Sequence, residues 1–287
     1  MDKRIGAQYY TIRDHIQTIE DFDESCRKVK EIGYQIVQIS GTPLKGNAFV
    51  NTYYYIKSLE IFLDICRVTG KKQYLEEIRD RIRRKKAAMV RSYFSEETGD
   101  FAENEQGANA FALDLGLGDG RTFENMVSHY VRTKQYDTGI FGTDVVTRVL
   151  LEKGRPDVAV SLLASEEKVS FYSHMRNGGT TLLEHWDGDR SHCHPMFGAV
   201  TKYLFAYILG IRQTEHSAAY ESVVIEPTCM AQIPTAKGGI ETVRGKIGVE
   251  YDPHTISVTI PENMTAVLIL KGTEFKLTPG MNTFNIE

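Results

Sequence analysis

The sequence has few of the residues that mark a disulfide-bonded, membrane-spanning or nucleic-acid-binding protein. Its 287 residues include four cysteines without a Cys-x-x-Cys pair, so we expect four free thiols. The formal net charge of -4 offers no basic surface to nucleic acid or to an anionic membrane. The longest apolar run, Ala266 to Leu270, is far too short to span a bilayer. The N-terminus lacks the apolar core of a signal peptide, which predicts a cytoplasmic protein.

The hydrophobic period changes twice along the chain and predicts three domains, residues 1–46, 47–213 and 214–287. In the first domain, Arg4 to Gln8 and Gln35 to Ser40 have the pattern of strands. Thr18 to Ile32 has that of an amphipathic helix ended by Gly33. These elements make one βαβ fragment, which cannot bury both faces of a parallel sheet by itself.

The second domain is expected to be an array of helical hairpins joined by short turns. Ile56, Leu59, Leu63 and Cys66 form an apolar stripe at helical spacing. The basic run Arg79 to Lys86 is accompanied by acidic residues, so we interpret it as a solvated helix face rather than a phosphate site. Later helices are predicted over Ala108 to Leu115, Phe123 to Val131, Asp144 to Leu151, Pro156 to Leu163 and Val200 to Ile208.

The third domain has a hydrophobic period of two and predicts a small antiparallel β domain. It holds no cluster of catalytic residue types, so packing against the helical part is its expected role. Strands are predicted over Ile247 to Tyr251, Thr255 to Ile260, Thr265 to Leu270 and Glu274 to Leu277.

The loop from Gly178 to Gly198 is the strongest candidate for chemistry. It contains the single tryptophan, Trp186, one glutamate, Glu184, and three histidines. A carboxylate beside an indole suits a general base in sugar chemistry, because the ring offers an apolar face to a pyranose and the carboxylate deprotonates water. The alternative is that Glu184 caps a nearby helix and Trp186 is half-buried packing.

The same loop raises the rival hypothesis of a zinc site. Its imidazoles, thiol and carboxylates are ligand types for zinc, but no helical pair of histidines four residues apart and no second Cys/His cluster completes a tetrahedral set. We therefore predict neither metal nor cofactor and expect hydrogen bonding to substrate or to the loop backbone. The residues concerned are His174, His185, Asp187, Asp189, His192, Cys193 and His194.

Two further segments are candidates for the same end of the helical array. Tyr136 to Thr143 is a turn rich in small and hydroxyl residues, and the alternative is an ordinary connection with Asp144 as the next N-cap. Glu103 to Ala108 offers polar side chains, and capping of the following helix is its alternative explanation.

From about residue 47 onward the chain resembles the last part of an α-L-rhamnosidase of glycoside hydrolase family 78. The resemblance runs in order through Val50-Asn-Thr-Tyr-Tyr-Tyr55, Thr138-Gly-Ile-Phe-Gly-Thr143, Gly179-Thr-Thr-Leu-Leu-Glu-His-Trp-Asp-Gly188 and Ser191-His-Cys-His-Pro-Met-Phe-Gly198. It implies part of an (α/α)6 six-hairpin barrel followed by a small antiparallel β-sandwich. It also implies a rhamnose-containing saccharide or glycoside as the substrate.

The resemblance assigns roles within the loop. The family's general base for inverting hydrolysis is matched by Glu184, and Trp186 and His194 fall among residues that line the sugar pocket. His185, Thr138 and Gly139 complete the predicted substrate contacts. Leu183 stands where many members have tryptophan.

The family's general acid lies in an Asp-Cys-Pro-Gln-Arg-Asp-Glu-Arg-like segment, and nothing resembling it occurs in this sequence. Inverting hydrolysis needs two carboxylates, so activity is expected to be weak or absent. A truncated barrel also exposes apolar helix faces, which predicts self-association or poor solubility.

The N-terminal residues, about 1–44, instead resemble the opening βαβ of a xylose-isomerase-like sugar phosphate isomerase or epimerase. This resemblance rests on Ile5 to Asp14 and Val29 to Gly41 and stops near Pro43. We interpret the chain as two incomplete pieces joined near residues 44–48. The functional hypotheses are thus a rhamnosidase-like fragment, a non-catalytic carbohydrate-binding remnant and, least favoured, a sugar phosphate isomerase.

Overall fold

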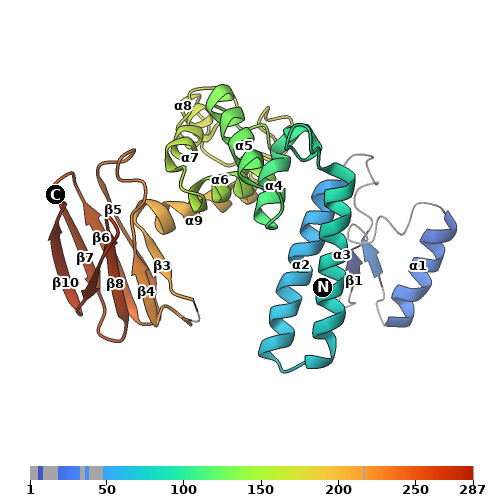
Figure 1. Cartoon of the computed structure of the whole chain (residues 1–287), viewed down its shortest axis with the longest axis horizontal. Helices are drawn as coiled ribbons and strands as arrows, with labels where there is room; N and C mark the ends of the chain where they lie inside the picture. The colour runs from blue at the N-terminus through green and yellow to red at the C-terminus, as the bar shows by residue number, and fades with distance from the viewer. Residues whose placement is uncertain (1–5, 9–18, 33–35, 39–47, 216, 287) are drawn as a thin grey trace. The chain divides into compact units, whose positions relative to one another are not determined.

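The computed structural model describes residues 6–8, 19–32, 36–38, 48–215 and 217–286 (Figure 1). The chain divides into two compact units, residues 1–85 and residues 86–287. No helix in these described ranges is both long and apolar enough to cross a membrane. The predicted junction at residues 44–48 lies outside the described residues except for Ala48.

The N-terminal βαβ unit is confirmed over its described part. Strands β1 (Gly6–Gln8) and β2 (Ile36–Gln38) pair in parallel, and helix α1 (Ile19–Ile32) connects them in sequence. The predicted ends at Arg4, Thr18, Gly33, Gln35 and Ser40 lie outside the described residues.

A helical hairpin follows, made of α2 (Ala48–Val68), the 3-10 turn η2 (Lys72–Tyr74) and α3 (Leu75–Tyr93). The predicted stripe packs here, because Leu63 and Cys66 are buried against Ile78 of the second helix. The basic run of α3 forms ion pairs within its own helix, such as Arg81 with Glu77 at 2.7 Å. These side chains are exposed, which confirms the solvated face.

The second unit continues the helical array. Helix α4 packs against α5 and α6, and longer segments, 94–107, 134–141 and 177–194, precede α4, α6 and η4. Each candidate loop therefore leads directly into the N-terminus of a helix. The elements are η3 (Ala102–Gly107), α4 (Ala108–Asp114), α5 (Gly120–Thr133), α6 (Gly142–Glu152), α7 (Pro156–Leu163), α8 (Phe171–Arg176), η4 (Pro195–Val200), α9 (Thr201–Tyr203) and η5 (Leu204–Ile208).

Neither of the two capping alternatives is observed. Asp144 is not an N-cap, because α6 begins at Gly142 and the Asp144 carboxylate instead accepts a hydrogen bond from the Tyr203 hydroxyl at 2.8 Å. The N-cap of α4 is Gly107, without a side-chain cap bond. Glu103 and the polar residues after it are therefore not explained by capping.

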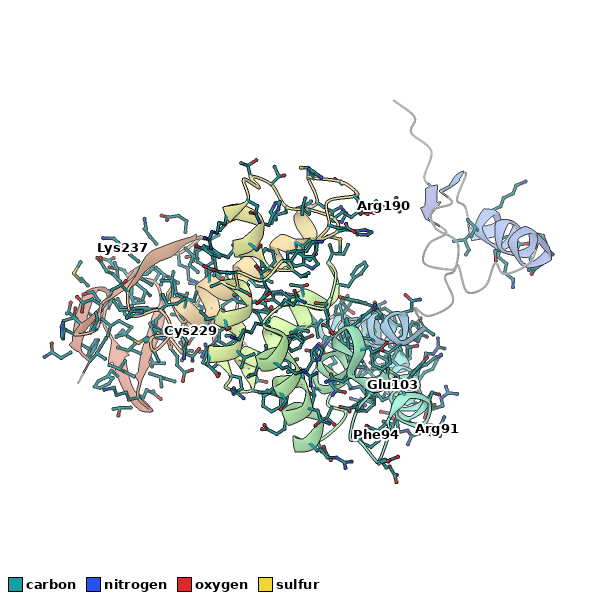
Figure 2. The ribbon with its side chains drawn as sticks, turned by 90° about the horizontal axis from the view of Figure 1, so that it is seen from above. Arg91, Phe94, Glu103, Arg190, Cys229 and Lys237 are labelled. Atoms are coloured by element: carbon teal, nitrogen blue, oxygen red, sulfur yellow. The ribbon has the colours of Figure 1, made fainter. Side chains whose placement is uncertain are left out.

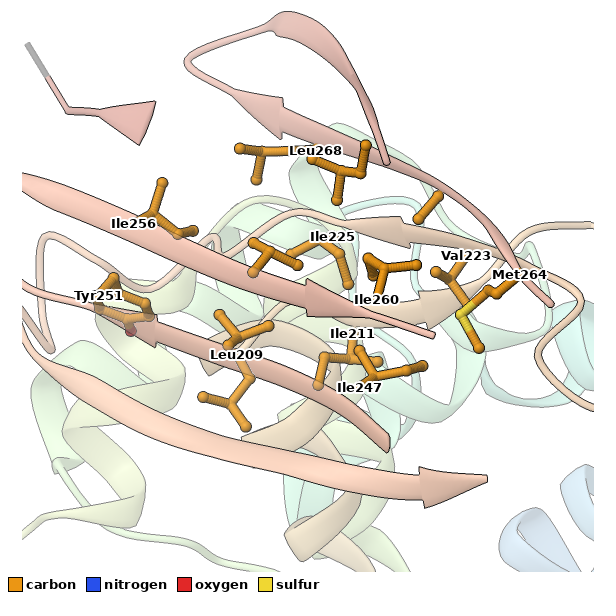
Figure 3. Close-up of a cluster of buried hydrophobic side chains, with 14 residues drawn as sticks. Leu209, Ile211, Val223, Ile225, Ile247, Tyr251, Ile256, Ile260, Met264 and Leu268 are labelled. Atoms are coloured by element: carbon orange, nitrogen blue, oxygen red, sulfur yellow. The ribbon is translucent and has the colours of Figure 1, made fainter. Parts of the chain in front are cut away.

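The C-terminal part is a β-sandwich whose two four-stranded sheets have the orders β10-β7-β6-β5 and β3-β4-β8-β9. Residues from both sheets, among them Ile225 and Leu268 of one and Ile247 and Ile256 of the other, meet in one apolar core (Figure 3). The strands are β3 (Ile211–Gln213), β4 (Ser222–Ile225), β5 (Ala236–Thr242), β6 (Gly245–Tyr251), β7 (Thr255–Ile260), β8 (Thr265–Leu270), β9 (Thr273–Leu277) and β10 (Gly280–Asn285).

The sandwich is antiparallel apart from one pair. Strands β4 and β8 run parallel, with Val223 opposite Ala266. The chain leaves the first sheet after β4, builds three strands of the other sheet and then returns, and such a long crossover permits parallel pairing.

Candidate functional site

The predicted catalytic loop is an irregular segment between α8 and η4. Two backbone hydrogen bonds hold its arms together, from the Glu184 N–H to the Ser191 carbonyl and from the His194 N–H to the Leu182 carbonyl, both 2.8 Å. Leu183 is buried between them. The loop therefore has a fixed base, from which the Glu184 side chain projects.

Gly179 allows a close approach at the start of this loop. A Cβ atom there would lie 2.2 Å from Nε2 of His174, and the same imidazole lies 2.8 Å from the Thr181 carbonyl oxygen. His174 is thus used to hold the loop backbone, which agrees with the predicted preference for hydrogen bonding over metal binding.

Glu184 and His194 lie side by side. Oε2 of Glu184 is 3.9 Å from Nδ1 of His194, and the two side chains are 34% and 27% exposed. The same carboxylate oxygen accepts a long hydrogen bond, 3.4 Å, from the Ser191 N–H and caps no helix. Nε2 of His194 is buried and has no hydrogen-bond partner among the described residues. A partly exposed carboxylate next to an imidazole can accept a proton from water.

Trp186 is anchored at both its ring and its N–H. The indole lies in an aromatic cluster with Tyr136, Phe171 and Phe197, with ring centroids 6.1, 5.1 and 4.3 Å away. Its Nε1–H donates to the Thr138 carbonyl at 2.8 Å. The predicted meeting of the two loops is therefore observed, and packing accounts for much of the indole surface.

Thr138 and Gly139 differ in their exposure. The Thr138 side chain is buried, and its hydroxyl is 3.0 Å from that of Thr143. Thr138 thus uses its hydroxyl for the turn and its carbonyl for Trp186. Gly139 is exposed, and its carbonyl accepts hydrogen bonds from the N–H and the hydroxyl of Thr143, at 3.1 and 3.0 Å.

The remaining histidines of the loop are exposed and bonded locally. Nδ1 of His185 lies 2.9 Å from Oδ1 of Asp189, and Nε2 of His192 lies 2.8 Å from the Gly188 carbonyl oxygen. His185, Asp187 and Asp189 offer ligand atoms within 4.8 Å of one another. Hydrogen bonding by the Asp189 backbone N–H holds the pKa of the Asp187 carboxyl below its usual value.

Two candidate segments from the sequence, Glu103 to Ala108 and Tyr136 to Thr143, contribute residues to a polar cleft in the same unit. The cleft has a volume of about 850 Å3 and is lined by the segment 98–106, the second half of α5 and Asp137 (Figure 2 labels Glu103). Asp137 accepts a hydrogen bond from the Tyr130 hydroxyl at 2.7 Å and lies 3.2 Å from Nε2 of His129. Burial, followed by the Asp137 charge, raises the pKa of Tyr130. Nothing in the sequence indicated that Asn125, Ser128, His129 and Arg132 of α5 complete this cleft.

The comparisons with known proteins identify the family. Residues 7–208 match the bacterial α-L-rhamnosidase six-hairpin glycosidase domain, and residues 210–284 match the bacterial α-L-rhamnosidase C-terminal domain. The chain therefore belongs to the bacterial α-L-rhamnosidase family. The first match begins at residue 7 and therefore includes the N-terminal βαβ unit.

Curated relatives are considerably longer than this chain. An α-L-rhamnosidase of Alteromonas sp. (strain LOR) is 29% identical over 147 residues, which are 46% of this chain and 16% of the relative. An α-L-rhamnosidase of Formosa agariphila is 22% identical over 286 residues, covering 93% of this chain and 30% of the relative. The chain thus spans less than a third of either relative.

Solved structures share the fold. The Streptomyces avermitilis α-L-rhamnosidase complexed with L-rhamnose has a TM-score of 0.75 at 19% identity. The matched region covers 93% of this chain and 30% of the Streptomyces chain. The α-L-rhamnosidase of Dictyoglumus thermophilum has a TM-score of 0.74 at 19% identity, with coverages of 96% and 37%. The chain therefore combines a helical hairpin part of the six-hairpin type with the C-terminal β part.

Proposed function

We propose that this chain carries the general-base half of an inverting α-L-rhamnosidase site. The observation that carries the proposal is the pair formed by Glu184 and His194, with 3.9 Å between Oε2 and Nδ1, in a loop anchored by Trp186. Glu184 takes a proton from the water that attacks the sugar carbon, and His194 and Trp186 line the rhamnose. His185 and the exposed backbone of Gly139 supply further sugar contacts.

The expected activity is low. In an inverting glycosidase a second carboxyl group, about 6.5–9.5 Å from the base, protonates the departing oxygen. No segment of this sequence resembles the one that supplies this acid in the family. Loss of general acid assistance reduces the rate by about 10²–10⁴. Terminal α-L-rhamnosides with good leaving groups are therefore the best substrates, since they depend least on the acid.

The test is hydrolysis of an aryl α-L-rhamnoside by the chain and by Glu184→Gln. The amide cannot accept the water proton, so we expect the rate to fall by about 10²-fold or more. Glu167→Gln is the matched control, because Glu167 is an exposed glutamate outside the site. Equal rates for all three proteins would exclude Glu184 as the base.

A second candidate function is carbohydrate binding without turnover. This function is favoured because no segment of the sequence resembles the one that supplies the general acid. It is also favoured by the fixed orientation of Trp186, whose Nε1–H donates a hydrogen bond of 2.8 Å to the Thr138 carbonyl. Binding of L-rhamnose should change the fluorescence of Trp186, the only tryptophan in the chain. Saturable binding with no product, equal in the chain and in Glu184→Gln, would favour this function over hydrolysis.

The isomerase-like origin of residues 1–44 is a further proposal. The parallel pairing of β1 with β2 supports it, whereas the rhamnosidase match from residue 7 argues against it. We infer no isomerase activity, because the metal-binding residues of such enzymes come from later strands. Metal-dependent isomerisation of a sugar phosphate would reverse this conclusion.

Self-association is proposed from the surface of α2. Ile61, Phe62, Ile65 and Val68 are exposed apolar side chains on this helix, and contiguous apolar surface favours association. Size-exclusion chromatography is expected to show species larger than a monomer. A clean monomer that binds no apolar dye would refute this expectation.

From composition and charge we propose a cytoplasmic location, with neither nucleic acid nor membrane as a partner.

A further inference from the structure

The geometry points to a second sugar site in the polar cleft, and we propose that this cleft holds the residue to which the rhamnose is attached. This inference rests on the proposed function. It makes the preferred ligand a rhamnosyl saccharide rather than a rhamnoside of a flat aromatic alcohol. Every residue that lines the cleft is polar, so its hydrogen-bonding capacity matches the hydroxyl groups of a sugar better than the face of an aromatic alcohol.

The cleft presents hydrogen-bonding groups that the protein does not use itself. The side chains of Glu103, Glu105, Gln106, Ser128 and Arg132 line it, and among the described residues none of the five makes a hydrogen bond or ion pair. The carboxylates are acceptors, the guanidinium is a donor, and the amide and hydroxyl are both. Such a mixture complements the hydroxyl groups of a sugar.

Other lining groups are held by internal bonds and form a rigid wall. Asp100 accepts hydrogen bonds from the side-chain amides of Asn109 and Asn125, at 2.7 and 2.9 Å. Asn104 donates from its amide to the Asn125 carbonyl at 3.4 Å. The unused groups therefore project from a fixed backbone, which reduces the entropy lost on binding.

The segment that carries the acceptors has an unusual conformation. Glu103, Asn104 and Gln106 have φ values of 59°, 57° and 47°, in the left-handed region that residues with a side chain rarely adopt. Strain of this kind persists only where the surrounding structure imposes it, and it concentrates at ligand sites. Capping does not account for it, as α4 is capped by Gly107 without a side-chain bond.

The cleft and the proposed rhamnose site are joined by consecutive residues. Asp137 lines the cleft, and the carbonyl of the next residue, Thr138, accepts the Trp186 N–H at 2.8 Å. From this link we infer that a ligand with two linked sugars contacts both places. The carboxylates of Asp100, Glu103, Glu105 and Asp137 outnumber Arg132 at the cleft, so the second sugar is neutral rather than acidic.

Binding to the full chain tests the proposal, in a Glu184→Gln background that prevents turnover. The probes are methyl α-L-rhamnoside and α-L-rhamnopyranosyl-(1→6)-D-glucose, followed by NMR titration. We expect the disaccharide to bind about tenfold more tightly. Arg132→Ala should remove about fivefold of that advantage and leave the affinity for methyl rhamnoside unchanged. Lys168→Ala, which removes an exposed cation outside the cleft, should change neither affinity.

The outcomes separate this inference from the proposed function. Equal affinities for the two probes, or equal weakening of both by Arg132→Ala, would overturn the second sugar site while rhamnose binding stands. Methyl β-D-glucoside alone should shift the amide signals of Gln106 and Asn125. If neither rhamnoside binds but this shift occurs, the proposed function fails and the cleft is supported. If the cleft signals respond to no sugar, the inference is wrong.

Discussion

Gly107 couples the backbone of the cleft to the tryptophan of the catalytic loop, and Gly107→Ala tests this coupling. Gly107 has a φ of +75°, and a Cβ atom there would lie 2.8 Å from the Thr138 methyl group and 3.1 Å from a methyl group of Val146. Thr138 has no room to retreat, since its methyl group packs against Gly142, where an added Cβ would lie 2.7 Å away. Its hydroxyl is also paired with Thr143.

The expected loss of stability has two parts. Alanine in the left-handed region costs about 1–2 kcal/mol. The added methyl group in a filled space costs about 1–3 kcal/mol more. Gly154→Ala provides the matched control, because Gly154 has a φ of +78° and a Cβ atom added there would have nothing within 4 Å. The difference in the free energy of unfolding between Gly107→Ala and Gly154→Ala therefore gives the steric part.

Urea unfolding followed by circular dichroism gives the free energy of unfolding of each variant. Gly107→Ala should be less stable than Gly154→Ala by about 1–3 kcal/mol. Displacement of Thr138 should also lengthen its bond to Trp186 and change the fluorescence of the folded protein, whereas Gly154→Ala should leave the emission unchanged. Equal stabilities together with identical emission spectra would refute the coupling.

Two further predictions concern stability. Tyr251 is buried, its hydroxyl has no hydrogen-bond partner among the described residues, and burial raises its pKa to about 12. Tyr251→Phe should therefore stabilise the protein by about 1 kcal/mol. Because the folded pKa lies above the usual value of about 10, the wild type should lose more stability than the variant between about pH 10 and 12; an equal loss of stability in both proteins would contradict this. Asp119 caps α5 by accepting hydrogen bonds from the Thr122 and Arg121 N–H groups, and the Thr122 bond is the main cause of its lowered pKa. Asp119→Ala should lower the urea midpoint at pH 7, by an amount that shrinks as the pH falls below about 4 and the wild-type carboxylate takes up a proton; a difference independent of pH would count against the cap.

Periodicity predicted the elements that depend on a single continuous apolar face. The strands over Thr255 to Ile260 and Thr265 to Leu270 and the helix over Pro156 to Leu163 have the predicted bounds. The short helix α8 escaped prediction, as six residues contain too little of a helical period to recognise. The parallel pairing of β4 with β8 also escaped, because strand direction depends on which sheet the chain rejoins.

The candidate site was predicted in part. The loop composition singled out Glu184, Trp186 and His194, and the turn at Thr138 was expected near them. The use of the Thr138 hydroxyl within its own turn was not foreseeable, because the sequence does not show whether a threonine in a loop faces solvent or the core. The cleft was predicted only in part for a related reason: the polar segment Glu103 to Ala108 was recognised, but its joining with α5 depends on packing between segments that are separate in sequence.

The sequence by itself determined the chemical types present in this protein. One loop contains a carboxylate, an indole and imidazoles within a few residues of one another, and no acidic segment matches the family's general acid. Tertiary structure alone decided how those groups are used. It placed Oε2 of Glu184 beside His194, fixed Trp186 through a carbonyl 48 positions away and gathered unpartnered polar side chains in one cleft. The reason is that distance and burial depend on how separate segments pack, and a linear sequence does not contain those distances.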